Sequence, residues 1–171
     1  PADGQRMGLK GMIYEMIKLA DRDLAAETPE QMEGLFLGQT KDLARVITAL
    51  EQDRLANRHL RAVRNCADQR AAIPVLGITG TGGAGKSSLT DELIRRFRLY
   101  SDEPRIAVIA IDPSRRKTGG ALLADRIRMN AISSPNIFMR SLATRGSESE
   151  VPPAISDIVV ACKAAGYDLI I

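Results

Sequence analysis

The chain has 171 residues, of which 44% are hydrophobic and 26% charged, and its 24 basic and 21 acidic side chains leave a net charge of +3. This composition is that of an ordinary globular domain, and it excludes a wholly disordered chain and a fibrous repeat. The excess of basic residues is too small for a surface that binds nucleic acid along its phosphates. No apolar run is long enough to cross a membrane, and Cys66 and Cys162 fit neither a disulfide framework nor a metal-binding spacing, so we expect a cytoplasmic protein without nucleic-acid or membrane partners.

The first third of the chain is predicted to be helical with one interruption. Residues 1–23 carry apolar side chains at helical spacing, which predicts one amphipathic helix. Residues 24–39 are polar and contain one proline and two glycines, so we expect a linker or short irregular structure there.

A long helix is predicted from Thr40, whose side chain we expect to cap it, and we expect a break in this helix near Asp53. Arginines recur at helical spacing along its second half, and we interpret them as a solvated face rather than a binding patch. His59, the only histidine, has no acid or nucleophile beside it in the sequence, so a catalytic role is not expected.

From residue 73 the pattern changes to short apolar runs separated by helical segments. Runs at 73–79, 105–111, 136–142 and 167–171 read as strands, and the segments 88–99 and 154–165 read as helices. Strands that alternate with helices over short connections indicate an α/β fold with a parallel sheet covered on both faces.

A glycine-rich loop joins the first of these runs to the first helix. Residues 80–87 match the pattern G-x-x-x-x-G-K-[ST] at every fixed position, with an apolar run before and an amphipathic helix after. The glycines allow backbone N–H groups to converge on an anion, and the helix N-terminus adds a positive partial charge. Lys86 would bind the β- and γ-phosphates of a nucleotide, Ser87 would coordinate Mg²⁺, and Ser88 is placed toward the α-phosphate. A glycine-rich turn with a chance lysine is the alternative, which motif and context together disfavour.

A second group of candidate ligand residues follows the run at 105–111. Asp112 lies at the carboxyl edge of the predicted sheet, where ligands of open α/β folds bind. Asp125 and Arg128 lie three residues apart in a helical stretch, so one acid and one guanidinium share a face. On spacing alone an ordinary surface ion pair beside a solvated loop explains these residues equally well.

These motifs closely resemble the MeaB/ArgK group of P-loop GTPases, which act as chaperones of adenosylcobalamin-dependent mutases. The resemblance is carried by residues 80–88, by the block Ile111-Asp-Pro-Ser-Arg-Arg-Lys-Thr-Gly-Gly-Ala-Leu-Leu-Ala-Asp-Arg-Ile-Arg-Met129 and by residues 136–145. It implies a P-loop GTPase fold preceded by helical segments, with Lys86 and Asp112 in catalysis. The implied nucleotide ligands are Gly83, Ala84, Gly85, Lys86, Ser87, Ser88 and Arg128, and the implied Mg²⁺ ligands are Ser87, Ile111, Asp112 and Asp125. One departure is Ala124, where the family usually has glycine.

Within this group the chain looks most like the GTPase part of fused adenosylcobalamin-dependent acyl-CoA mutases, which interconvert isobutyryl-CoA and n-butyryl-CoA. The resemblance implies that residues 1–23 end a cobalamin-binding domain, that 24–72 form a helical linker and that 73–171 begin the GTPase domain, so we expect a segment truncated at both ends. It also implies GTP and GDP as ligands, cobalamin-binding and mutase domains as partners on the same polypeptide, a homodimer, and a role in gating cofactor delivery and protecting the holoenzyme.

Three alternatives stay open. The chain could be a stand-alone GTPase chaperone of a methylmalonyl-CoA mutase, a P-loop kinase of small molecules, or a non-catalytic binding module. No [NT]-K-x-D motif, which reads guanine, occurs in the sequence, so GTP rather than ATP follows from the resemblance only. A kinase would need a base for its acceptor, and none is identifiable.

Overall fold

The computed structural model describes residues 2–21, 23, 25, 26, 28–112, 129–144 and 151–171. The predictions that concern residues 113–128 and 145–150, including those for Ala124, Asp125 and Arg128, lie outside the described residues. Within them the fold is built on a three-stranded parallel sheet with the order β2-β1-β3. The strands are β1 (Ile106–Asp112), β2 (Ile137–Ala143) and β3 (Leu169–Ile170). The α/β fold predicted from the alternation of apolar runs is confirmed.

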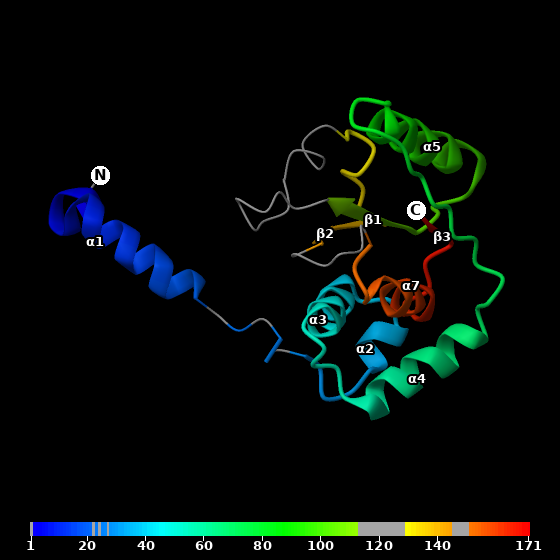
Figure 1. Ribbon diagram of the computed structural model, residues 1–171, viewed down its shortest axis with the longest axis horizontal. Helices are drawn as coiled ribbons and strands as arrows, with labels where there is room; N and C mark the ends of the chain where they lie inside the picture. The colour runs from blue at the N-terminus through cyan, green and yellow to red at the C-terminus, as the bar shows by residue number, and fades with distance from the viewer. Residues whose placement is uncertain (1, 22, 24, 27, 113–128, 145–150) are drawn as a thin grey trace.

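Helices cover both faces of this sheet (Figure 1). Helix α5 (Lys86–Tyr100) lies on one face, and α3 (Thr40–Glu51) and α7 (Ile155–Ala164) lie on the other. Side chains alternate along the strands, so that Phe138 and Leu142 enter the core that contains α3 and α7, while Ile137 and Met139 pack with Ile94 of α5. Strands buried on both faces explain the nearly continuous apolar runs in the sequence.

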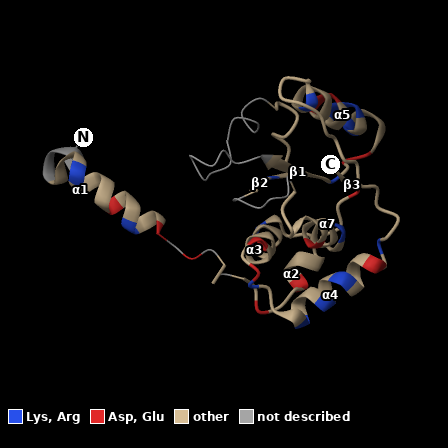
Figure 2. Cartoon of the chain, in the orientation of Figure 1, with Lys and Arg blue, Asp and Glu red and all other residues tan. Residues whose placement is uncertain are grey.

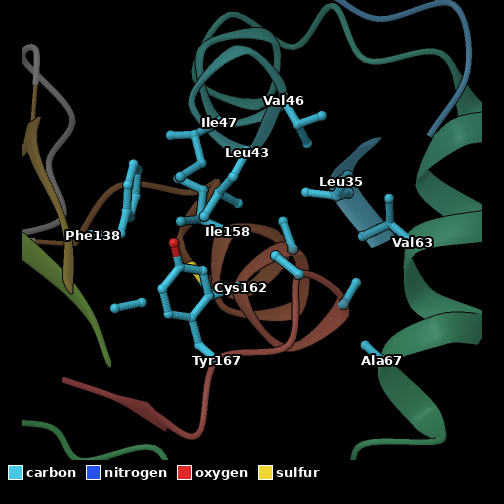
Figure 3. Packing of buried hydrophobic residues seen from close by; sticks show 14 of the residues in the cluster. Leu35, Leu43, Val46, Ile47, Val63, Ala67, Phe138, Ile158, Cys162 and Tyr167 are labelled. Atoms are coloured by element: carbon cyan, nitrogen blue, oxygen red, sulfur yellow. The ribbon is translucent and has the colours of Figure 1, made fainter. Parts of the chain in front are cut away.

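The larger core brings the helices before residue 73 into the same unit as the sheet. Helix α4 (Asn57–Asp68) packs along α7, and α3 crosses the other side of α7. Figure 3 shows Leu43 and Ile47 of α3 above Ile158 and Cys162 of α7, with Tyr167 beside them. The residues before the glycine-rich loop therefore contribute a large part of the core.

The expected break in the long helix is confirmed. Helix α3 ends at Glu51 and α4 begins at Asn57, and between them Asp53 adopts the left-handed conformation with φ of 53°. The predicted cap is wrong, since Gln39 precedes the helix and no side-chain hydrogen bond caps it. Thr40 is instead hydrogen-bonded to Tyr167, a residue 127 positions along the chain.

The stretch expected to be an irregular linker contains a short helix, α2 (Glu33–Phe36). Met32 and Leu35 are both buried in the larger core, where Leu35 lies near Val63 of α4 (Figure 3). Glycine and proline content correctly indicated that no long helix forms here, but two apolar side chains in a polar context are enough to hold the segment against the core.

The arginine-rich face of α4 is solvated, as predicted. Arg58 and Arg61 are exposed, and Arg58 donates a hydrogen bond to its half-buried neighbour His59. Figure 2 shows basic positions spaced along the length of α4. Arg64 differs, because its guanidinium pairs with Asp157 of α7 at 2.7 Å and so joins the two helices.

Helix α1 (Ala2–Ala20) stands apart from the sheet and its helices in Figure 1. Its backbone leaves helical geometry at Gly8, where φ is 62°. Several of its large apolar side chains are exposed, among them Leu9, Tyr14, Met16 and Leu19. Among the described residues, no helix combines the length and the apolar character that a membrane span requires.

The run at 73–79 forms less strand than predicted. It makes a single parallel bridge, between Val75 and Ile170, supported by a hydrogen bond of 2.8 Å from the Leu76 N–H to the Ile170 carbonyl. The strand prediction is therefore wrong in extent, since only Val75 of this run forms a bridge to the sheet. The run still lies beside the sheet and leads directly into the glycine-rich loop.

Candidate functional site: the glycine-rich loop

The loop of residues 80–85 owes its shape to glycines in conformations that other residues rarely adopt. Gly80, Gly83 and Gly85 have φ of 152°, 80° and 83°, and Gly85 is the residue that precedes α5. A Cβ atom added at Gly83 or Gly85 would meet no heavy atom within 4 Å. The glycines are thus required by backbone conformation and not by crowding, and the space in front of the loop is open.

Lys86 begins α5 and folds back over the loop. Its Nζ donates hydrogen bonds to the carbonyl oxygens of Gly80 at 2.8 Å and Thr81 at 2.9 Å. The ammonium therefore sits over the loop that is predicted to bind phosphates. Because both partners are exposed backbone carbonyls, an incoming anion can compete for this cation without breaking the core.

The hydroxyl residues that follow take different places. Ser87 is half-buried in the first turn of α5, and Ser88 is exposed. Buried Thr90 donates a hydrogen bond of 2.9 Å to the Lys86 carbonyl, one turn earlier. This bond fixes the first turn of the helix, whose N–H groups form the positive end of the helix dipole.

A cavity of about 280 Å³ lies next to this first turn, at the carboxyl edge of the sheet. The polar side of the cavity is formed by Lys86, Ser87 and Thr90. Ile111 of β1 also lines the cavity. The remaining lining is apolar and comes from β1, β2, α7 and the segment before the loop: Val75, Leu76, Gly77, Ile78, Val108, Ile109, Ala110, Met129, Met139, Ile155, Val159, Ile170 and Ile171. The structure thus brings two predicted magnesium ligands, Ser87 and Ile111, to one cavity.

Asp112 ends β1 and pairs with Ala143 of β2, so its backbone lies at the edge of the sheet where the prediction placed it. Its side chain, like the whole of Asp125 and Arg128, lies outside what the structure describes. Within the described part of the chain no three acidic, cysteine or histidine side chains gather as a metal site. The donors that are described, a serine hydroxyl and a backbone carbonyl, are oxygens of the kind that Mg²⁺ prefers.

One contact near the loop was not predicted. Asp91, four residues after Ser87, accepts a hydrogen bond from the Ala131 N–H at 2.7 Å through its Oδ1. The spacing of four would have placed Asp91 on the Ser87 face of the helix, but no sequence pattern indicates that its partner lies 40 residues away.

Groups with displaced pKa values lie elsewhere in the described structure. Hydrogen bonds from Arg95 and then Arg96 lower the pKa of Glu92 to about 2, on the exposed face of α5. Burial raises the pKa of Cys162 to about 12, and burial also raises that of Tyr167, against a smaller opposing effect of its hydrogen bond with Thr40. These buried groups belong to the core around α7.

Comparison with known protein families gives a match over residues 43–171 to the family described as methylmalonyl-CoA mutase-associated GTPase MeaB. The match begins within α3, so it includes helices that precede the glycine-rich loop. It covers the phosphate-loop residues, Ile111, Asp112, Asp125 and Arg128.

Individual relatives fall into two size classes. The chain is 59% identical over its whole length to a fused isobutyryl-CoA mutase of Cupriavidus metallidurans and 55% identical to one of Nocardia farcinica. It spans 16% of the length of each of these proteins. A protein of Pyrococcus abyssi that is named as a GTPase is 41% identical over 82% of the chain, and the match covers 43% of that protein.

Proposed function

The chain belongs to the MeaB family of methylmalonyl-CoA mutase-associated GTPases, and on this premise we propose that it binds and hydrolyses GTP as the chaperone segment of a fused adenosylcobalamin-dependent acyl-CoA mutase. The observation that carries the nucleotide part is the position of Lys86. It lies at the start of α5, over a loop of left-handed glycines that presents open space. An anion bound there meets backbone N–H groups, the helix dipole and one ammonium together.

In the proposed mechanism the protein acts by positioning charge. Gly83, Ala84, Gly85 and Ser88 contribute N–H groups to the phosphates, and Lys86 exchanges its two loop carbonyls for the β- and γ-phosphate oxygens. These groups stabilise the negative charge that is redistributed as the terminal phosphoryl group leaves. No covalent intermediate with the protein is required.

Ser87, the Ile111 carbonyl, Asp112 and Asp125 would hold Mg²⁺, which when bound neutralises phosphate charge. Of this set, Ser87 and Ile111 line one cavity. Arg128 would contact the nucleotide. Hydrogen bonding by these residues orients the substrate, while the apolar walls beside Ser87 restrict water on that side.

The wider role is proposed from the relatives. In the fused mutases the chain corresponds to about a sixth of the protein. We assign to this part the gating of adenosylcobalamin delivery and the protection of the holoenzyme. The reaction of the whole protein would be the reversible isomerisation of isobutyryl-CoA and n-butyryl-CoA. Residues 1–23 would end a cobalamin-binding domain, and residues 24–72 would link it to the sheet of residues 73–171, with α3 and α4 sharing the core around α7. The assembly would be a cytoplasmic homodimer. The exposed apolar side chains of α1 support contact with such a neighbouring domain.

One observation favours a second candidate, a stand-alone GTPase chaperone. The Pyrococcus abyssi relative is short enough that this chain covers 43% of it. The mass of the native polypeptide separates the two. A protein several times larger than 18.5 kDa with mutase activity supports the fused form, and a modestly larger one without that activity supports the stand-alone form.

The nucleotide proposal is tested by titrating fluorescent GTP and ATP analogues, with Mg²⁺, into the wild-type protein, Lys86→Ala and the control Lys41→Ala. Lys41 is an exposed lysine of α3, far from the loop in sequence. We expect Lys86→Ala to weaken GTP binding by about a hundredfold, since a charge-assisted contact is removed, and Lys41→Ala to bind as the wild type does. Equal affinity of wild type and Lys86→Ala would overturn the proposal, and a preference for ATP would overturn its guanine part.

A further inference from the structure

The side chain of Asp91 joins the phosphate-loop helix to a distant part of the chain. Its Oδ1 accepts a hydrogen bond from the backbone N–H of Ala131, with 2.7 Å between the heavy atoms. Asp91 is half-buried in the second turn of α5, and Ala131 lies in the turn that precedes β2. A carboxylate that accepts a backbone N–H away from bulk water makes one of the stronger hydrogen bonds in proteins.

Both ends of this bond adjoin the proposed nucleotide site. Asp91 follows Ser87 by four residues and therefore lies one helical turn behind it on the same face. Two residues before Ala131, Met129 is 5% exposed and packs against Ile94 of the same helix. Met129 also lines the cavity that Lys86 and Ser87 line.

Few other polar contacts hold this stretch. Within the described part of the chain, no second hydrogen bond joins residues 129–133 to another element, and the turn's own bond, from the Ser133 N–H to the Asn130 carbonyl, is long at 3.5 Å. The position of Met129 relative to Ser87 thus depends on apolar packing, which is non-directional, and on the Asp91 carboxylate, which is directional.

We propose that Asp91 is a positioning residue of the nucleotide site, which sets the distance between the first turn of α5 and the chain at Met129–Ala131. This inference rests on the proposed function. Met129 lines the cavity that Lys86 and Ser87 also line, so this distance fixes one wall of that cavity relative to the first turn of α5. Asp91 acts through the Ala131 backbone and does not touch the nucleotide.

The test compares Asp91→Ala, Asp91→Asn and a control, Glu92→Gln, in the intact protein. Asparagine keeps a carbonyl oxygen that can accept the Ala131 N–H, whereas alanine does not. Glu92 is the adjacent residue, and its partners are Arg95 and Arg96 on the exposed face of α5. The measurements are affinity for a fluorescent GTP analogue with Mg²⁺, kcat and KM for GTP, thermal unfolding, and hydrogen exchange of the Ala131 amide.

We expect Asp91→Ala to weaken GTP affinity and raise KM by about tenfold, with faster exchange at Ala131, because a hydrogen bond to a charged group is lost. Asp91→Asn should recover most of the affinity and the protection at Ala131, and Glu92→Gln should match the wild type in both. If Asp91 only stabilised the fold, Asp91→Ala would lower the unfolding temperature but leave KM for GTP unchanged. Asp91→Asn would then have no change in KM to reverse.

Two results would overturn the inference. One is wild-type GTP affinity in folded Asp91→Ala, and the other is an Ala131 amide that stays protected in that variant. If Asp91→Ala does not fold, the wild type is compared with and without GTP. Greater protection of Ala131 with GTP supports the inference, and equal protection overturns it. A wild-type protein that binds no GTP overturns the proposed function itself, which the Lys86→Ala titration shows separately.

Discussion

Arg140 and Glu51 form an ion pair of 2.6 Å that joins the middle of β2 to the last residue of α3. Glu51 is only 15% exposed in its side chain and Arg140 31%, and the same guanidinium donates to the Thr48 hydroxyl at 3.1 Å. The contact spans 89 residues and ties a helix that precedes the phosphate loop to the strand that follows it.

We therefore predict that Glu51→Ala lowers the free energy of unfolding by about 1–2 kcal/mol, because it leaves a partly buried guanidinium with one neutral partner. Glu51→Gln should lose less, since its amide oxygen still accepts from Arg140. Urea denaturation measures both. The matched control is Glu92→Ala, whose two arginine partners are well exposed, and an equal loss in that variant would show that burial of the pair is unimportant.

The second prediction concerns the left-handed glycines. Gly83→Ala should weaken nucleotide affinity by about tenfold, because an alanine held at φ of 80° is strained by about 1–2 kcal/mol and the loop would relax away from its binding shape. Gly8→Ala is the control, since Gly8 also has a positive φ, of 62°, and an added Cβ meets nothing within 4 Å, but it lies in α1 and far from the loop in sequence. Titration with a fluorescent GTP analogue measures the affinity of each variant. Wild-type affinity in Gly83→Ala would show that the positive φ of Gly83 is not required for binding.

The third prediction is a loss of stability at alkaline pH. Burial raises the pKa of Cys162 from 9.0 to about 12, so the native state holds the thiol proton more tightly than the unfolded state does. The resulting stability is fully present below pH 9 and is lost as the pH rises from 9 toward 12. Denaturation at stepped pH should show this decline.

Cys162→Ala should make that decline less steep, because it removes one titrating group while Tyr167, whose pKa burial also raises, remains. Cys66→Ala is the control, since Cys66 is only half-buried. Because Cys162 is buried and Cys66 is only half-buried, we also expect a thiol reagent to modify Cys66 in the native protein and Cys162 only after unfolding. An identical pH profile in wild type and Cys162→Ala would be inconsistent with the assignment.

The fourth prediction concerns Arg105, the residue that precedes β1. Its guanidinium lies 4.6 Å from the centre of the Tyr167 ring and donates to the carbonyls of Gly38, Ala165 and Gly166. Arg105→Lys should lower the free energy of unfolding by about 1–2 kcal/mol, because an ammonium cannot stack on the ring and reach three carbonyls at once.

Arg105→Ala should lose more than the lysine variant, and Arg98→Ala, at an exposed position of α5, should change little. Both are measured by urea denaturation. If Arg105→Lys is as stable as the wild type, the planar guanidinium contributes nothing beyond its charge.

The sequence predicted correctly those elements that are determined by residues close together in the chain. The break at Asp53, the start of α5 after Gly85 and the helix of α7 each follow from the residues that form them. The failures have distant causes. Thr40 does not cap α3 but is hydrogen-bonded to Tyr167, and the run at 73–79 joins the sheet only through the bridge of Val75 with Ile170. Leu35, in a stretch that reads as linker, is buried by helices that lie beyond it in the chain.

The glycine-rich loop could be predicted from the sequence, because glycines, a lysine and a serine at fixed spacing specify a backbone shape and a charge within eight residues. The surroundings of that loop could not be predicted, because they depend on contacts between distant residues. The bond from Ala131 to Asp91 and the pair of Arg140 with Glu51 join residues 40 and 89 positions apart. Hydrophobic burial brings such residues together without regard to their spacing, and directional hydrogen bonds then select among the neighbours that burial has supplied.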